Sequence, residues 1–285
     1  MLFDLQSPRR RRVVRVVFGG LAIIFAISFV FLGVGTGGGG FSFSDLFGGG
    51  GGSSSTAFDD DIDAAQAKLV VNPQDTTALG NLVRLQYSAA NSNTDSNGAP
   101  TSDGVEHLRE AADAWNKYVK ATNGNISPTA AVYALNTFDL LARIDFSQAR
   151  TDTSTTEALA DVNAAVDDWK SAAQAQQVLI TKQPKKATSN SYATLAQYLY
   201  LAGDTKGGDQ AAAQAKAIKG ADASTIDSQL KQVQQLGQQL QQAIKQISKQ
   251  QQTQGATGGG ATGGGATGGG TGGANPLNGL GTGGL

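Results

Sequence analysis

Few side chains in this 285-residue sequence have the type and spacing that chemistry needs. His107 is the only histidine, and it stands between Glu106 and Leu108 at the expected start of a helix, where we expect it to be solvated. No catalytic triad can be built around it, and the sequence has neither a G-x-S-x-G elbow nor a glycine loop that cradles phosphate. The absence of cysteine excludes thiolate metal sites and a cysteine nucleophile. We therefore expect no catalytic residue and no enzymatic activity.

Two polar stretches have oxygen-bearing side chains that can bind metal ions. Residues 93–98 are similar to a calcium-binding loop, but Gly104 stands where such a loop needs a bidentate glutamate, and Pro100 fills its usual apolar position. The aspartates at positions 59, 60, 61 and 63 lack ligand spacing. They fit the first turn of a helix better, where carboxylates meet free N–H groups and the positive end of the helix dipole. We expect neither a metal nor a cofactor.

The elements that carry the remaining polar residues are predicted to be helices. Leu79, Leu82 and Tyr87 follow a period of 3.6 residues, and the same spacing recurs along the central part of the chain. Glycines are expected to end helices at positions 124, 203 and 220. No stretch alternates with period 2 for long enough to predict a strand. The sequence predicts an all-α fold, with helices that include residues 59–71, 79–90, 105–119, 128–142, 157–181, 192–199 and 211–218.

The expected helices are arranged in pairs. Pro73, Pro128 and Pro184 each precede a helix pair and are 55 and 56 residues apart. One amphipathic pair cannot bury its own apolar face, so the pattern favours a stack of pairs over residues 58–220. An irregular helical bundle is the alternative.

Three stretches resemble the tetratricopeptide repeat family. At residues 72–82, an Asn-Pro-Gln-Asp sequence precedes an Ala-Leu-x-x-Leu helix; residues 192–204 look like the same helix with a Gly-Asp turn, and residues 110–115 are similar to the second helix of a repeat. The 34-residue spacing of the family is missing, because residues 91–104 and 147–156 look like insertions. The resemblance implies an α-solenoid whose first helices line a concave groove for a peptide or a partner domain. Carried over residue by residue, it implies partner binding by Arg84, Tyr87, Asn136, Asp139, Gln197 and Tyr200.

The last helix is expected over residues 224–251, with Ser224 and Asp227 at the spacing of a capping box. Its apolar residues follow heptad-like steps of four and three, with Gly237 in the seam. This pattern has two interpretations. The helix either caps the repeat array, which we favour, or forms the seam of a homodimer. Residues 252–285, which are rich in Gly, Ala and Thr, are expected to be disordered.

The N-terminal region predicts a transmembrane helix. Residues 16–35 contain no charge and are long enough to cross a hydrocarbon core of roughly 30 Å. Arginines beside a first span stay in the cytoplasm, and this span follows Arg9, Arg10, Arg11, Arg12 and Arg15. A cleaved secretory signal is the alternative, although its apolar region is usually shorter and ends in small residues. We expect a single-pass protein of a bacterial cytoplasmic membrane, with residues 1–15 inside and the helical domain outside.

The remaining features concern partners. A glycine- and serine-rich linker at residues 36–57 is expected to tether the helical domain to the membrane. Residues 16–285 carry a net charge of −5 without a basic patch in the sequence, so we expect no nucleic-acid partner. These features together predict a membrane-tethered, non-enzymatic scaffold or adaptor that binds protein partners. A cell-envelope structural or substrate-binding helical bundle is the alternative.

Overall fold

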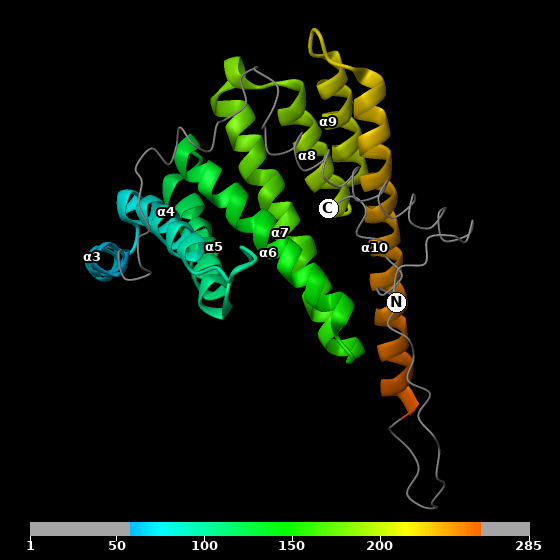
Figure 1. The fold of residues 1–285 in the computed structure, drawn as a ribbon, viewed down its shortest axis with the longest axis horizontal. Helices are drawn as coiled ribbons and strands as arrows, with labels where there is room; N and C mark the ends of the chain where they lie inside the picture. The colour runs from blue at the N-terminus through cyan, green and yellow to red at the C-terminus, as the bar shows by residue number, and fades with distance from the viewer. Residues whose placement is uncertain (1–57, 258–285) are drawn as a thin grey trace, which may run out of the picture. The chain divides into compact units, whose positions relative to one another are not determined.

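The computed structural model describes residues 58–257, and within them the fold is all-α, as the periodicity predicts. Among these residues there is no β-strand, and the only β-type pairing is an isolated antiparallel bridge between Thr94 and Pro100. A 3-10 turn, η2 (Pro184–Lys186), follows α7. The α-helices, labelled in Figure 1, are α3 (Asp59–Val71), α4 (Thr76–Ser92), α5 (Ser102–Thr122), α6 (Pro128–Thr151), α7 (Thr155–Lys182), α8 (Ser189–Leu201), α9 (Thr205–Ala217) and α10 (Ala223–Thr257).

One of the two expected insertions is much shorter than predicted. α6 does not end near Ala142 but continues to Thr151, and α7 begins at Thr155, so the insertion at residues 147–156 shrinks to a short turn. The physical reason is burial: Phe146 is 3% exposed and Ala149 is fully buried, so the apolar face of α6 continues past Ala142. The other insertion is a true loop between α4 and α5.

The helix ends follow the expected glycines, but the start of α10 differs from the prediction. Gly124, Gly203 and Gly220 have φ values of +85°, +83° and +85°, a conformation that favours glycine. α10 is not capped by Ser224. The carboxylate of Asp222 instead accepts hydrogen bonds from the backbone N–H groups of residues 224 and 225, at 3.0 and 3.2 Å.

The helices pack as hairpins of sequence neighbours (Figure 1). α4 packs on α5, α6 on α7, and α8 on α9; successive hairpins contact each other through α5 and α6 and through α7 and α8. α3 packs on α4, and α10 packs on α7, α8 and α9. The arrangement is the stack of helix pairs that the proline spacing predicts, and it is consistent with a helical solenoid.

Two large apolar cores lie along this stack. The first contains Trp115 and Phe138 and joins α3 to α7. The second contains Phe146 and Trp169, whose ring centroids are 5.6 Å apart, and joins α6 to α10. Because α6 and α7 contribute buried residues to both cores, these two long helices hold the two halves of the domain together.

α10 covers the last hairpin through the apolar stripe that the heptad-like pattern contains. Its members are all buried: Ile226, Leu230, Val233, Leu236, Leu240, Ala243 and Ile247. Gly237 lies so close to the backbone of α8 that a Cβ atom there would meet the carbonyl oxygen of Tyr200. The stripe is therefore occupied within the chain, which favours the capping helix over a homodimer through residues 224–251.

None of the helices within residues 58–257 is both long and apolar enough to cross a membrane. The predicted span at residues 16–35, the linker at 36–57 and most of the tail at 252–285 lie outside the described residues. The anchor and the topology set by the N-terminal arginines therefore remain predictions.

Candidate partner-binding surface

A fixed ion pair stands on the exposed side of α6. Arg143 donates from Nε to Asp139 Oδ2 at 2.9 Å and from Nη2 to Oδ1 at 3.3 Å. The Asp139 side chain is 26% exposed and that of Arg143 is 47% exposed, so both are accessible to a partner. Asn136 precedes them by one turn, and the spacing of three and four residues places all three side chains on one face of α6.

Two tyrosines from neighbouring helices lie beside this pair. Burial, followed by the negative charge of Asp139, raises the pKa of Tyr198 well above its ordinary value. The pKa of Tyr87 is also raised, first by burial and in part by the charge of Asp139. Asp139 of α6 therefore lies near Tyr87 of α4 and near Tyr198 of α8.

The six residues implied by the repeat resemblance divide into two groups. Tyr87 and Tyr200 are each 5% exposed, and their rings belong to the packed interior: Tyr87 lies 5.7 Å from the ring of Tyr133. Because both side chains are buried, little of either is accessible to a partner. Position in the family pattern alone does not separate groove residues from core residues. The other four are part-exposed, namely Arg84, Asn136, Asp139 and Gln197.

Arg143 and Tyr198 were not among the residues expected from the sequence. The signal for Arg143 was present, since Asp139 and Arg143 are four residues apart on an expected helix face and can form an ion pair. The sequence contains no comparable signal for Tyr198, because Tyr198 is on another helix and lies near Asp139 only as a result of how α8 packs. Arg84 is part-exposed and stands one helical turn before Tyr87 on α4. We define the polar face as Arg84, Asn136, Asp139, Arg143 and Tyr198.

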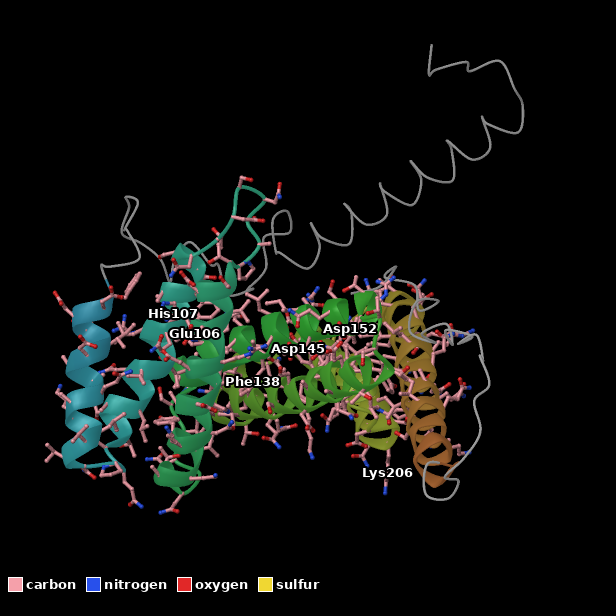
Figure 2. All side chains as sticks on the ribbon, turned by 90° about the horizontal axis from the view of Figure 1, so that it is seen from below. Glu106, His107, Phe138, Asp145, Asp152 and Lys206 are labelled. Carbon is pink, nitrogen blue, oxygen red and sulfur yellow. The ribbon has the colours of Figure 1, made fainter. Side chains whose placement is uncertain are left out.

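His107 is only partly solvated, whereas the sequence predicts a fully solvated side chain: 23% of it is exposed. Its Nδ1 atom lies 2.6 Å from Oε1 of Gln86, a residue of α4 that is 1% exposed, and 4.0 Å from the carboxylate of Glu110. Figure 2 labels His107 on α5. The contact joins α4 to α5 inside the first hairpin. The histidine therefore pairs with the amide oxygen of the buried Gln86 side chain, while the Nε2 atom of the same amide has no hydrogen-bond partner among the described residues. The two residues that contact the histidine, Gln86 and Glu110, are not nucleophiles.

An acidic cluster lies between α5, α6 and α7. It consists of Asp145, Asp161 and Asp168, and Arg109 is 3.9 Å from Asp145, which Figure 2 labels. Burial, followed by the charges of Asp145 and Asp167, raises the pKa of Asp168 to about 7. Burial also raises the pKa values of Asp145 and Asp161. The carboxyl group of Asp168 can therefore take up a proton close to neutral pH.

The described residues contain no group of three or more His, Cys, Asp or Glu side chains placed to hold a metal ion. In the loop that is similar to a calcium site, Asp95 accepts hydrogen bonds from the backbone N–H groups of Asn97 at 2.8 Å and Ala99 at 2.9 Å. These bonds lower the pKa of Asp95. Its carboxylate therefore closes the turn.

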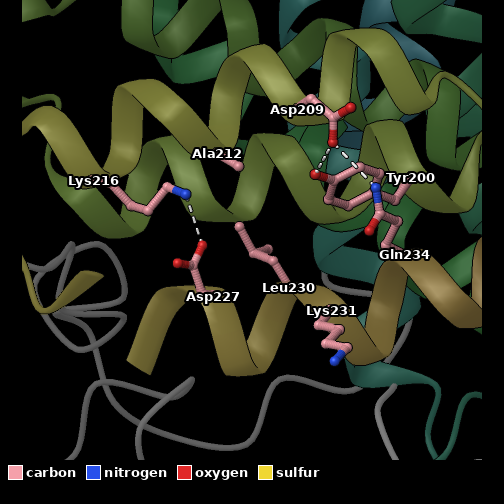
Figure 3. A pocket seen from close by; sticks show the side chains of 8 residues that line it. All are labelled: Tyr200, Asp209, Ala212, Lys216, Asp227, Leu230, Lys231 and Gln234. Carbon is pink, nitrogen blue, oxygen red and sulfur yellow. Dashed lines mark hydrogen bonds and ion pairs between the residues drawn. The ribbon is translucent and has the colours of Figure 1, made fainter. Parts of the chain in front are cut away.

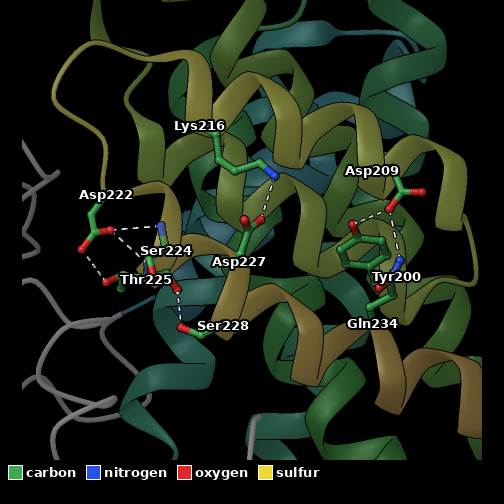
Figure 4. A network of polar contacts seen from close by, with 9 residues as sticks. All are labelled: Tyr200, Asp209, Lys216, Asp222, Ser224, Thr225, Asp227, Ser228 and Gln234. Carbon is green, nitrogen blue, oxygen red and sulfur yellow. Dashed lines mark hydrogen bonds and ion pairs between the residues drawn. The ribbon is translucent and has the colours of Figure 1, made fainter.

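A pocket of about 360 Å³ opens between α8, α9 and α10 (Figure 3). Most of its polar side chains are engaged with one another. Asp209 Oδ1 accepts hydrogen bonds from the hydroxyl of Tyr200 at 2.8 Å and from Nε2 of Gln234 at 3.1 Å, and Lys216 Nζ lies 2.7 Å from Asp227 (Figure 4). Burial and the contact with Asp209 raise the pKa of Tyr200. These contacts attach α10 to the last hairpin, so we assign the pocket a structural role.

The polar face is thus the best candidate for contact with a partner, because it is part-exposed, charged and carried by three separate helices. The comparisons with known proteins add no family to this description. No protein-family model, curated protein or solved structure matches the chain. The tetratricopeptide resemblance stays a prediction, and what the structure establishes is an all-α domain of stacked helical hairpins closed by α10.

Proposed function

We propose that this chain is a membrane-tethered, non-enzymatic adaptor that binds protein partners outside the cytoplasm through a tetratricopeptide-like helical domain. The observation that carries the proposal is the bidentate Asp139–Arg143 pair on the polar face. Two hydrogen bonds hold the guanidinium of Arg143 in place, so this side chain loses little conformational entropy when a partner binds to it. Arginine and tyrosine also dominate the strong contacts of protein interfaces, and Tyr198 lies beside Asp139.

The stacked hairpins support the same function. Each helix of the polar face belongs to a different hairpin, and each hairpin is fixed by its own buried residues. Residues on such a scaffold keep their spacing when a partner binds, which favours recognition of an extended or helical segment laid across α4, α6 and α8.

Arg143→Ala is expected to lower the recovery of bound partners about tenfold, the loss of a single interface contact of roughly 1.4 kcal/mol. The full-length protein would be purified from cells after cross-linking, and each recovered protein would be quantified against the wild type. Lys117→Ala is the matched control, because Lys117 is an exposed cation on α5, a helix that contributes no residue to the polar face. If every partner is recovered equally with Arg143→Ala and with Lys117→Ala, the polar face is not the binding site.

The topology has its own test. A protease added to intact cells and to spheroplasts is expected to cut residues 36–57 only when it can reach the outer side of the cytoplasmic membrane, while cytoplasmic marker proteins stay intact. Cleavage that requires lysis of the membrane would place the domain inside the cell and overturn this part of the proposal. Binding of the protein to isolated cell-wall material, with no protein partner recovered, would favour the cell-envelope alternative.

A further inference from the structure

Charge is divided unevenly along the helical domain. Residues 58–168 contain 17 acidic and 7 basic side chains, whereas residues 169–257 contain 4 acidic and 10 basic ones. The second half is therefore net positive by 6 charges, in a domain whose first half is net negative by 10. All ten cations of the second half are lysines, since the last arginine of the sequence is Arg150.

The fold gathers five of these lysines at one end of the last two hairpins. Lys182 ends α7 and two more stand in η2, while the other two lie at the end of α9 and just after it. Ser189 Oγ donates to the carbonyl oxygen of Ala215 at 2.9 Å, which ties the start of α8 to the end of α9 and brings the two loops together (Figure 1). We call this set the lysine end: Lys182, Lys185, Lys186, Lys216 and Lys219.

The two acidic residues nearby leave most of this positive charge uncompensated. Asp227 pairs with Lys216, and Asp222 caps α10 through the bonds drawn in Figure 4. Lys182, Lys185 and Lys219 remain exposed. Interaction with the helix dipole accounts for lysines in the last turns of α7 and α9, but not for those placed beyond the helices.

The composition of the lysine end indicates which partner it fits. Protein interfaces are anchored by Trp, Tyr and Arg in desolvated pockets, and the lysine end has no arginine. The large apolar side chains exposed among the described residues are Val70 and Val71, both on α3. Lysine is a mobile, strongly hydrated point charge, which suits diffuse attraction to a surface of negative headgroups.

We propose that the lysine end binds the anionic lipid surface of the membrane to which the chain is tethered. This inference rests on the proposed tether, because a tether turns a weak contact into an intramolecular one. The acidic first half is repelled by the same surface. The domain therefore stands with the loops at 182–188 and 216–222 against the bilayer, and the far ends of α6 and α7 point away from it.

The test uses energy transfer from the full-length chain to a labelled lipid in reconstituted vesicles. Because the sequence has no cysteine, Ala223→Cys gives a unique label at the lysine end and Ser147→Cys a unique label near the far end of α6. The 28-residue α7 separates these ends by roughly 40 Å. With phosphatidylglycerol in the vesicles, transfer from residue 223 should exceed that from residue 147 at least about twofold, and in roughly 0.5 M salt the difference should vanish.

Two variants with the same change of charge decide whether the lysine end is responsible. Replacing lysines 182, 185, 186 and 219 by glutamine should abolish the lipid-dependent difference. Replacing the exposed lysines 170, 206, 231 and 245 should leave it intact. Equal transfer from both labels in anionic vesicles, or equal loss in the two variants, would overturn the proposal, and the second result would assign the effect to net charge alone.

Failure of the tether has a different signature. A chain without a membrane span would not float with pure phosphatidylcholine vesicles, whatever its lysines do. Salt-sensitive flotation with phosphatidylglycerol vesicles that needs lysines 182, 185, 186 and 219 would then still support the lysine end. Transfer between two labelled chains that needs the same lysines, without any dependence on lipid, would instead identify an acidic protein surface as the partner and overturn the lipid assignment.

Discussion

Gly237→Ala is expected to loosen α10 from the helical array and to lower the free energy of unfolding by about 2 kcal/mol. A Cβ atom at this position would meet the carbonyl oxygen of Tyr200, which is backbone of α8. Because the clash is not with a flexible side chain, α10 must move as a whole. Alanine favours a helix over glycine by roughly 1 kcal/mol, so the overpacking cost has to exceed this gain for the protein to be destabilised.

Gly80→Ala is the matched control for this prediction. Gly80 is also inside a helix, α4, but a Cβ atom there would lie 3.4 Å from Cε2 of Tyr118, an ordinary contact. The same substitution should therefore be neutral or stabilising by up to about 1 kcal/mol. Urea denaturation followed by tryptophan fluorescence measures both, since Trp115 reports on the first core and Trp169 on the core that α10 covers. If the two variants unfold at the same urea concentration, the close approach of α10 and α8 is not tight.

The sequence was sufficient for the parts of the fold that depend on local pattern. Helix type, the ends at glycines 124, 203 and 220, and the pairing of helices after each proline follow from spacing and backbone chemistry. The end of α6 was missed because the polar run from Ser147 to Thr156 resembles a loop locally. Burial of Phe146 and Ala149 in the second core outweighs that local signal.

The candidate site was predictable only in part, for a physical reason. A period of 3.6 residues shows which face of a helix is apolar, but not which neighbour covers it, so Tyr87 and Tyr200 could not be distinguished from groove residues. His107 was expected in solvent because its sequence neighbours are polar, whereas its partner Gln86 lies 21 positions away. The lysine end also could not be predicted from the sequence, because its two lysine-bearing loops come together only when α8 and α9 pair.

The acidic cluster is also brought together only by the packing of separate helices. Asp145 comes from α6, while Asp161 and Asp168 come from α7, with Arg109 of α5 the nearby cation. Burial in this cluster disfavours the charged carboxylates, and Asp145 is only 6% exposed. Arg109 lies 3.9 Å from Asp145, too far for a hydrogen bond, and so compensates only part of this cost.

The domain is therefore expected to become more stable as the pH falls from 8 to about 5. The pKa of Asp168 is about 7 in the folded protein, compared with an ordinary value of 3.8. A carboxyl group whose pKa is higher in the folded than in the unfolded protein adds to the free energy of unfolding. This contribution is fully present below the pKa of the unfolded protein and is lost as the pH rises through the pKa of the folded protein. Asp95 and Asp222, whose pKa values are lowered by hydrogen bonds, act in the opposite direction, but only as the pH falls through and below their ordinary range.

Asp168→Asn should remove most of this pH dependence and stabilise the protein at pH 8 by about 2 kcal/mol, a figure reduced from 1.4 kcal/mol per pKa unit because the side chain is part-exposed. The measurement is the free energy of unfolding in urea at pH 5, 6, 7 and 8. Asp63→Asn, which removes one exposed carboxylate of α3, should follow the wild-type curve. A wild-type stability that is flat or rises between pH 5 and 8 would show that the carboxyl groups between α5, α6 and α7 are better solvated or better paired than their burial indicates.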